Sequence, residues 1–547
     1  FNTAVGYDAG QSVTTGTENT LIGSLAGDAL TVGNSNVAVG VIALSADTKG
    51  DRNVAVGYGS LASQNFTSTT DSYNTAIGFS AGNSITTGTQ STIVGALAGD
   101  ALTTGGLVAV GYLAGSAATT SIGNVLMGEL SGTAITTGNN NTAFGSQALS
   151  TNITGTNNVA IGHDALRNST ASGNTAVGYN SLDANTSGNA NTAVGKDTLS
   201  TNISGANNTA VGNDALFANT ASNNTAVGTS AFLNNSSGDA GVAVGKSTLT
   251  SNTTGRFNTG CGYEALYSNT TGGYNTAVGQ FALGANTTAS YNVAVGNNAL
   301  DACTTGTRNV AVGRTALTAC TTGYDNTFVG EKAGEVLTVG YQNTAIGQYA
   351  LSAGSDMNKN AALGYASAFN ISTGDENTCL GTLAGYASTT TGTNNTMIGY
   401  YATAPSVSAD NTFTLGNSSV DNLRCADTSI SSLSDERDKK NIVDVPLGLD
   451  FIKTLRPVSF DWNARDGSRV GKKDFGFVAQ ELKTAQDATD YADHMRLVGT
   501  GELNLDSGKV EMLEADPMKT YPVLIKAVQE LSTALDAALA RIATLEG

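Results

Sequence analysis

A short motif that returns every 17 residues constrains the fold of this chain more than any other feature. The motif is Asn-Thr/Val-Ala-Val-Gly, and its closing glycine occurs 25 times between residues 6 and 416. Nineteen of the 24 intervals between these glycines are 17 residues long. A period this short is typical of a solenoid, in which one repeat cannot bury its apolar face alone and stacks on its neighbours. The sequence therefore predicts a mainly β fold, with a parallel β-solenoid shaft over residues 1–416.

The pentapeptide predicts a short strand that is covered on both faces. Its fourth position is apolar in all 25 copies, and its third is usually Ala. Side chains alternate across a strand, so we expect one face inside the coil and the other against another chain or a second layer. The first position is Asn in 21 copies. Stacked at ~4.8 Å per coil, these amides are expected to form a hydrogen-bonded ladder. Asn and Gly also tolerate the left-handed backbone that a coil corner needs.

Composition agrees with a continuously hydrogen-bonded β structure. The 547 residues include 67 glycines and only 13% charged residues, and all five prolines lie at or after position 405. Proline cannot donate to a ladder, so its absence from the repeats fits this prediction. Twenty-four coils would make a rod roughly 115 Å long at ~4.8 Å each. A triple β-helix of three interwound chains is an alternative with the same period.

Charge and cysteine content narrow the partners and cofactors. The net charge of −18 and the pI near 4.4 disfavour nucleic acid and anionic membranes as partners. No apolar run reaches the ~18–20 residues of a membrane-spanning helix, so we expect a chain that is not embedded in a membrane. The five cysteines form no Cys-x-x-Cys pair, and we expect no metal or other cofactor. Cys303 and Cys320 are one period apart, and we expect stacked, buried thiols rather than a disulfide.

Two irregularities of the repeat are candidate contacts for a receptor. The interval from Gly57 to Gly78 has four extra residues, within Ser60–Tyr73, which predicts a protruding loop. That loop is either a receptor contact or a tolerated insertion. Tyrosines that directly follow the closing glycine either form platforms for sugars or simply cover the shaft; they are Tyr7, Tyr58, Tyr112, Tyr179, Tyr263, Tyr365 and Tyr400. The chain begins at Phe1 inside a repeat, so we also expect an N-terminal attachment region to precede it.

The C-terminal part of the chain has a different composition. Residues 1–433 contain 11 Lys and Arg, and the last 114 residues contain 15. We expect a connector over 417–433 and a small α+β domain over 434–547. In that domain the pattern predicts a helical turn near 447–455, strands at 458–462 and 475–478, and a helix at 479–484. Phe460 and Trp462 are expected in its core.

A heptad pattern near the C-terminus predicts a coiled coil over residues 521–545, where four heptads follow one another. Such a helix would hold three chains together as a homotrimer. A 17-residue repeat pairs almost as well after a slip of one coil, so a separate aligning device is needed. The apolar positions are Tyr521, Leu524, Val528, Leu531, Leu535, Ala538, Ile542 and Leu545.

A serine and a lysine at the compositional boundary are candidate catalytic residues. Ser434 starts the stretch SDERDKKNI, and Lys439 follows five residues later. A serine needs an adjacent base to become a nucleophile, and lysine is able to be that base. The bond between Leu433 and Ser434 is the candidate target. Because residues five apart do not share a helical face, the pair is expected to meet across a turn or between chains.

The motifs of this region resemble a known family. SDERDKKNI, LRPVSFDWN at 455–463, FGFVAQEL at 475–482 and YPVLIKAVQEL at 521–531 are similar to the endosialidase-type C-terminal intramolecular chaperone of phage tail spikes and tail fibres. The resemblance implies trimer assembly followed by self-cleavage before Ser434, with Ser434 and Lys439 as the dyad and Asp435 and Arg437 in support. The chain departs from the family at Asp438, where a leucine is usual. A carboxylate beside Lys439 favours its charged form, which is the wrong direction for a base.

The resemblance also implies a setting and a role. It implies a virion tail protein that is assembled in the host cytoplasm, acts outside the cell and binds a host surface receptor, a glycan or an outer-membrane component. The repeats are similar to the head repeats of bacterial trimeric autotransporter adhesins, whose period is shorter.

Two other functions stay open from the sequence. A tailspike enzyme that degrades polysaccharide would need two carboxylates ~5–10 Å apart in a groove. The shaft's acidic residues are scattered, and Asp375-Glu376 lies in an expected turn. A bacterial surface adhesin would carry membrane-anchor strands at its C-terminus, where this chain has a heptad pattern instead.

Overall fold

The structure is a computed structural model, and it describes all residues except 387–390, 421–423, 425–434, 464–469, 506–507 and 547. The fold is a parallel β-solenoid of about 24 turns with a 17-residue repeat, followed by a small α+β region that ends in a long helix. The predicted fold class is confirmed. The chain divides into two compact units, Phe1–Gln342 and Asn343–Gly547. The boundaries at residues 416 and 433 stay a prediction.

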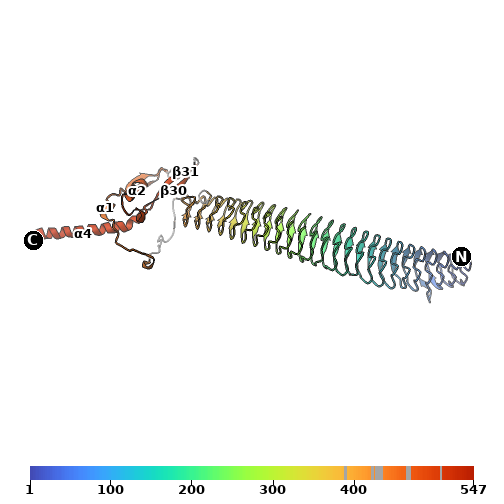
Figure 1. The fold of residues 1–547 in the computed structure, drawn as a ribbon. Helices are drawn as coiled ribbons and strands as arrows, with labels where there is room; N and C mark the ends of the chain where they lie inside the picture. The colour runs from blue at the N-terminus through green and yellow to red at the C-terminus, as the bar shows by residue number, and fades with distance from the viewer. Residues whose placement is uncertain (387–390, 421–423, 425–434, 464–469, 506–507, 547) are drawn as a thin grey trace. The chain divides into compact units, whose positions relative to one another are not determined.

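Short strands mark the coils of the first unit, which follow one another in chain order from blue to yellow in Figure 1. Twenty of them carry the pentapeptide: β1 (Thr3–Val5), β2 (Thr20–Ile22), β3 (Val37–Val39), β5 (Val54–Val56), β7 (Thr75–Ile77), β8 (Thr92–Val94), β9 (Leu107–Val110), β10 (Asn124–Met127), β11 (Thr142–Phe144), β12 (Val159–Ile161), β13 (Thr175–Val177), β14 (Thr192–Val194), β15 (Thr209–Val211), β16 (Thr225–Val227), β17 (Val242–Val244), β18 (Thr259–Cys261), β19 (Thr276–Val278), β20 (Val293–Val295), β21 (Val310–Val312) and β22 (Thr327–Val329). A separate two-stranded pair is formed by β4 (Gly50–Asp51) and β6 (Thr70–Asp71).

Each pentapeptide strand from β1 to β21 pairs in parallel with the strand one repeat further along the same chain. Ala277 of β19, for example, lies opposite Ala294 of β20. The same register holds where the interval is only 16 residues, since Val159 lies opposite Thr175. The coils therefore close within one chain, and the interwound triple helix is not the architecture found.

The coil corners also bond to the neighbouring coils, which satisfies backbone groups outside the strands. In the coil after Gly279, the Phe281 N–H donates to the Tyr263 carbonyl at 3.0 Å and the Leu283 N–H to the Ala299 carbonyl at 3.0 Å. On the other side of the coil, the Tyr291 N–H donates to the Gly273 carbonyl at 3.1 Å. The whole cross-section is therefore tied along the stack, not the strands alone.

The closing glycine is required by both conformation and space. Gly23 has φ +134°, a region that side chains rarely adopt, and a Cβ there would lie 2.4 Å from the Gly40 carbonyl oxygen. The first-position Asn itself does not have a positive φ. The left-handed corner belongs to the residue before it, which is Ser35 (φ 56°) in one coil and an asparagine, Asn157 (φ 58°), in another.

The interior of the coils is filled in two alternative ways. In one, a buried leucine sits four residues after the closing glycine, as Leu266 does with φ 53°. In the other, a glycine takes that place and an apolar residue three positions later fills the space, as Gly132 and Ile135 do. A Cβ on Gly132 would lie 2.8 Å from Leu126 and 2.9 Å from Ile135. Each coil therefore keeps its interior volume by exchanging two positions together.

The predicted asparagine ladder is present along the stack. Asn275, buried like the other members of this column, accepts a hydrogen bond on Oδ1 from the Asn292 backbone N–H at 3.0 Å. Its Nδ2 donates to the Ala289 carbonyl at 2.8 Å, across the width of the coil. One side chain thus links two coils and braces its own, which explains why Asn recurs at this position.

The second unit contains five more coils and the α+β region. Its coil strands are β23 (Thr344–Ile346), β24 (Ala361–Leu363), β25 (Thr378–Leu380), β26 (Thr396–Ile398) and β27 (Phe413–Leu415). The remaining elements are η1 (Glu436–Asp438), α1 (Leu449–Ile452), β28 (Val458–Asp461), β29 (Lys473–Gly476), α2 (Ala479–Asp487), α3 (Ala492–Met495), β30 (Val498–Leu505), β31 (Gly508–Ala515), η2 (Pro517–Thr520) and α4 (Tyr521–Glu546).

The core of the α+β region is small. It consists of Phe451 of α1, Leu482 of α2, Met495, Leu497 and Val523 of α4. The expectation that Phe460 and Trp462 lie in the core was wrong. Both are half-buried, and their rings pack edge to face at 5.2 Å outside that cluster.

Candidate functional site

Part of the predicted catalytic site lies outside the described residues. Leu433 and Ser434 belong to the stretch 425–434, which the structure does not describe. The description resumes at Asp435, so the surroundings of Arg437 and Lys439 are known while the serine's are not. The cleavage site and the dyad therefore stay predictions.

The residues after Ser434 form a single 3₁₀ turn, η1, that Asp435 caps. Asp435 Oδ1 accepts the Arg437 backbone N–H at 2.9 Å and its Nε–H at 3.0 Å, while Oδ2 accepts Nη2–H at 2.5 Å. The Arg437 guanidinium holds the pKa of the Asp435 carboxyl below its usual value. Both side chains are thereby used within the turn, which fits a supporting role.

Lys439 leaves this turn in an extended conformation. Its φ is −117° and its ψ 145°, and its backbone N–H donates to the Glu436 carbonyl at 3.1 Å. The side chain lines a groove of about 720 Å³ together with Val443, His494 and Lys519. The chain turns at η1 before Lys439; how Lys439 lies relative to Ser434 stays a prediction.

The predicted heptad lies on one long helix, α4, which is 26 residues long. Val523 and Ala527 on its first turns are buried, and α4 packs against α1 there. Glu530 reinforces this contact by accepting the Leu449 N–H at 2.7 Å, which caps α1. The heptad side chains named above are all exposed, for example Leu535 at 58% and Ile542 at 49%. Exposed apolar stripes of this kind are typical of helices that pack against a partner helix.

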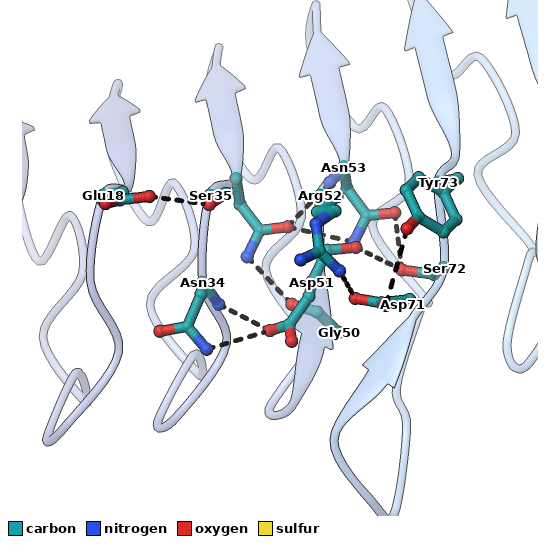
Figure 2. Close-up of polar contacts among 11 residues, drawn as sticks. Glu18, Asn34, Ser35, Gly50, Asp51, Arg52, Asn53, Asp71, Ser72 and Tyr73 are labelled. Atoms are coloured by element: carbon teal, nitrogen blue, oxygen red, sulfur yellow. Dashed lines mark hydrogen bonds and ion pairs between the residues drawn. The ribbon is translucent and has the colours of Figure 1, made fainter.

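The four extra residues of the repeat widen one corner of the solenoid, as Figure 2 shows. Here β6 pairs with β4 and the chain returns through Ser72, whose hydroxyl donates to the Asp51 carbonyl at 3.0 Å and to Asn53 Oδ1 at 2.8 Å. Arg52 pairs with Asp71 and lies over the Tyr73 ring, 5.6 Å from its centre. The predicted protrusion is therefore an ordered corner; whether it contacts a receptor stays open.

A buried carboxylate anchors the same corner from inside. Asp47 Oδ2 accepts the Gln64 amide at 2.7 Å, and Asp47 Oδ1 accepts the backbone N–H groups of Lys49 at 3.2 Å and Gly50 at 3.0 Å. Gln64 Oε1 in turn accepts the Asn74 amide at 2.9 Å. Burial raises the pKa of the Asp47 carboxyl, against the lowering effect of these hydrogen bonds. The hydrogen bonds follow one another from the Asn74 amide to Gln64 and from the Gln64 amide to Asp47, so each of these acceptor oxygens has a donor.

The Arg167 guanidinium lies near two aspartates of the shaft, Asp164 and Asp183. Arg167 donates Nη2–H to Asp183 Oδ2 at 3.1 Å, and its Nε lies 3.0 Å from Asp183 Oδ1 as an ion pair. Arg167 also lies 3.5 Å from Asp164, whose carboxylate contacts His163 Nδ1 at 2.9 Å. Burial raises the pKa of the Asp183 carboxyl, and Arg167 opposes this. Both carboxylates bind the same guanidinium, which ties neighbouring coils together. This arrangement differs from the opposed acid and base of a glycosidase.

A second asparagine ladder runs through part of the shaft, from Asn219 to Asn286, and the sequence reasoning missed it. Asn252, seven residues after a closing glycine, donates to Asn235 Oδ1 at 2.8 Å and accepts from Asn269 Nδ2 at 2.7 Å. The signal was available, because Asn recurs there in most coils that carry the leucine at position four.

The cysteines Cys303 and Cys320 end this second column. Both are buried free thiols, as predicted, and burial raises their pKa to about 11 and about 12 respectively. Asn286, the last amide before them, has a buried Oδ1 without a hydrogen-bond donor. The ladder of amide hydrogen bonds therefore ends at Asn286, because the next residue of the column is Cys303 and not an asparagine.

Two further properties bear on partners. Among the described residues, no group of three or more His, Cys, Asp or Glu side chains is arranged to hold a metal ion. In that same part of the chain, no helix has both the length and the apolar character to cross a membrane.

Comparison with known proteins assigns only the C-terminal region. No curated protein and no solved structure matches the chain. The matched segment begins at Ser434, the residue before the Asp435-capped turn, and it ends inside α3. Residues 434–493 match the Peptidase_S74 family, described as the chaperone of endosialidase.

Proposed function

We propose that this protein is the shaft of a phage tail fibre that binds a host surface receptor, and that its C-terminal domain directs trimer assembly and then cleaves itself off between Leu433 and Ser434. The observation that carries the proposal is the position of the matched segment. It begins at the residue where the repeats and their connector have ended and runs toward a helix with an exposed heptad face.

The need for a chaperone follows from the shaft itself. Within one chain the register of the coils is fixed by chain connectivity, but between chains a slip of one coil leaves nearly the same side chains in contact. Helix α4 does not repeat in that way, and its heptad face supports a parallel three-helix contact. Once three chains are aligned at this end, the shaft has one register in which to assemble.

The proposed cleavage is an acyl shift followed by hydrolysis. Ser434 Oγ attacks the Leu433 carbonyl carbon while Lys439 Nζ takes the hydroxyl proton. The C–N bond breaks as that proton passes to the Ser434 nitrogen, which leaves an ester between Leu433 and Ser434 Oγ. Water then hydrolyses the ester to the Leu433 carboxylate and a free Ser434 hydroxyl. Asp435 and Arg437 hold the turn that separates the two residues of the dyad.

Mass spectrometry of the expressed chain tests the cleavage. We expect wild type to yield a fragment that ends at Leu433 and one that begins at Ser434, and Ser434→Ala and Lys439→Met to stay intact. Asp438→Leu, which restores the family's usual residue, is expected to speed cleavage by removing the carboxylate beside Lys439. Identical masses for wild type and Ser434→Ala would end the cleavage proposal without touching the chaperone proposal.

Assembly is tested separately. A chain that lacks residues 434–547 is compared with Ser434→Ala by sedimentation and by electron microscopy. We expect trimeric rods from Ser434→Ala and monomers or misaligned aggregates from the shortened chain. A shortened chain that reaches the same native trimer at the same rate would overturn the chaperone role.

A further inference from the structure

One row of apolar side chains on the shaft is only partly covered within the chain. The fourth residue of each pentapeptide lies on the strand face opposite the third residue, which is usually a buried alanine. Among the twenty strands of residues 1–342 that carry the pentapeptide, none of these side chains is buried. Typical exposed fractions are 39% for Ile22, 37% for Val211 and 38% for Val278. The row is therefore a continuous apolar stripe, one side chain per coil.

The area of the stripe reaches or exceeds that of the largest apolar patch on a typical monomer surface. A fully exposed Val or Ile presents roughly 60–120 Å² of apolar surface, on the scale that relates area to transfer free energy. At about two-fifths exposure, twenty side chains leave on the order of 500–1,000 Å² uncovered. The largest apolar patch of a monomer is about 300–600 Å², and a standard interface buries about 800 Å² on each partner.

The surroundings of the stripe are those of an interface. At β21 and β22, ion pairs lie at both ends of the strands: Arg308 with Asp325 before them, at 2.5 Å, and Arg314 with Glu331 after them. Protein interfaces commonly have such an apolar centre between polar rims.

We propose that this stripe, the outward face of the strands from β1 to β22, packs against the same stripe of two further copies of the chain around a common axis. The proposal rests on the trimer of the proposed function and adds the surface that forms it. A copy of the chain is the partner that offers one apolar side chain at the same coil spacing over the whole length. The opposite side of the coils, which carries Thr and Ser in most turns, then faces solvent.

A natural cysteine reports directly on this contact. Cys261 occupies the stripe position in β18 and is exposed, whereas Cys303, Cys320 and Cys379 are buried. In the proposed trimer three Cys261 side chains approach one axis. In the Ser434→Ala protein with Cys425, the fifth cysteine, replaced by Ser, we expect a short bismaleimide to join two chains per trimer through Cys261, leaving the third chain unjoined. The further change Cys261→Ser is expected to abolish the product.

A matched cysteine on the other side of the same coil is the control. Thr254 is exposed on the turn that faces away from the strands. In the Cys261→Ser background, Thr254→Cys is expected to react with monofunctional maleimide and to give no joined chains. The proposed face would be overturned, with the trimer left intact, by either of two results. One is a trimer in which Cys261 reacts freely without joining chains. The other is joining by the Thr254→Cys variant but not through Cys261.

A pair of lysine substitutions gives a second, independent test. Val211 lies in the stripe and Ile203 lies on the outer turn of the same coil, with 37% and 53% of their surface exposed. We expect Val211→Lys to lower the trimer fraction at least tenfold in sedimentation at low protein concentration, and Ile203→Lys to leave it unchanged. Equal behaviour of the two variants would refute the assignment. A wild-type chain that is monomeric would refute the trimer and the face together.

Discussion

The second asparagine ladder makes a quantitative prediction, because its middle and its end differ in the partners that a substitution leaves unmatched. Asn252 lies in the middle: it donates to Asn235 and accepts from Asn269. Asn286 lies at the end: it donates to Asn269 Oδ1 at 2.6 Å, and its own Oδ1 has no donor. Cys303 occupies the next position of this column and is buried there. Cysteine is therefore a side chain that the column already accommodates, and we use Asn→Cys as the substitution.

The expected loss of local stability follows from the number of polar groups that each substitution leaves without a hydrogen-bond partner. Asn252→Cys leaves the Asn235 carbonyl without its donor and takes one of two acceptors from the Asn269 amide. Asn286→Cys leaves only the Asn269 carbonyl unmatched. A buried unmatched polar group costs about 1–3 kcal/mol, so we expect a loss of about 2–6 kcal/mol in local stability for Asn252→Cys and about 1–3 kcal/mol for Asn286→Cys.

Hydrogen exchange measured by mass spectrometry is the assay, because the coils of a solenoid open locally. At a tenfold change in rate for each 1.4 kcal/mol, amides of the altered coil should exchange roughly 5- to 150-fold faster in Asn252→Cys than in Asn286→Cys. Thr254→Ala, an exposed change in the same turn as Asn252, should leave the rates unchanged. Equal acceleration by the two cysteine variants would refute the idea that the amides form a continuous, directional ladder.

Three more predictions concern other parts of the molecule. Gly132→Ala should cost about 2–4 kcal/mol in urea unfolding, since it adds crowding to left-handed strain, whereas Gly173→Ala, with φ +70° and nothing nearer than 4.0 Å, should cost only about 1–2 kcal/mol. Burial raises the pKa of Asp47, so the folded state holds that proton more tightly. The contribution of Asp47 to stability should therefore fall as the pH rises from near the unfolded value of about 3.9 through the folded pKa, and unfolding of Asp47→Asn by urea should lack that slope. Leu531→Lys on the exposed heptad face of α4 should abolish trimers in sedimentation, while Gln529→Lys, off that face, should not.

The sequence predicts the shaft well because its evidence is repeated. A residue such as Asn275 occurs in nearly every coil, so its spacing alone indicates a stacked, hydrogen-bonded column. The helix from Tyr521 and the strand from Val458 were also predicted close to their observed bounds, because heptads and alternation are local patterns.

Other features could not be predicted because they depend on space or on packing. The left-handed residues are as varied as Ser35 and Gln90, so composition does not identify them. The half-buried position of Trp462 depends on how the β28–β29 hairpin meets the small core, which no local pattern encodes. In the sequence, a leucine such as Leu266 is replaced by a glycine such as Gly132 when an apolar residue follows three positions later. The reason for this pairing is that the two positions fill the same space inside the coil, which only the structure shows.

Each coil bonds only to the coil before it and the coil after it, and that has an evolutionary consequence. Whole repeats can be gained or lost by unequal recombination between near-identical gene segments, since the new neighbours present the same bonding groups. The 16-residue interval that keeps Val159 opposite Thr175 indicates that even imperfect copies are accommodated. The number of coils, and with it the length of the shaft, can therefore change without altering the groups that each coil presents to the next.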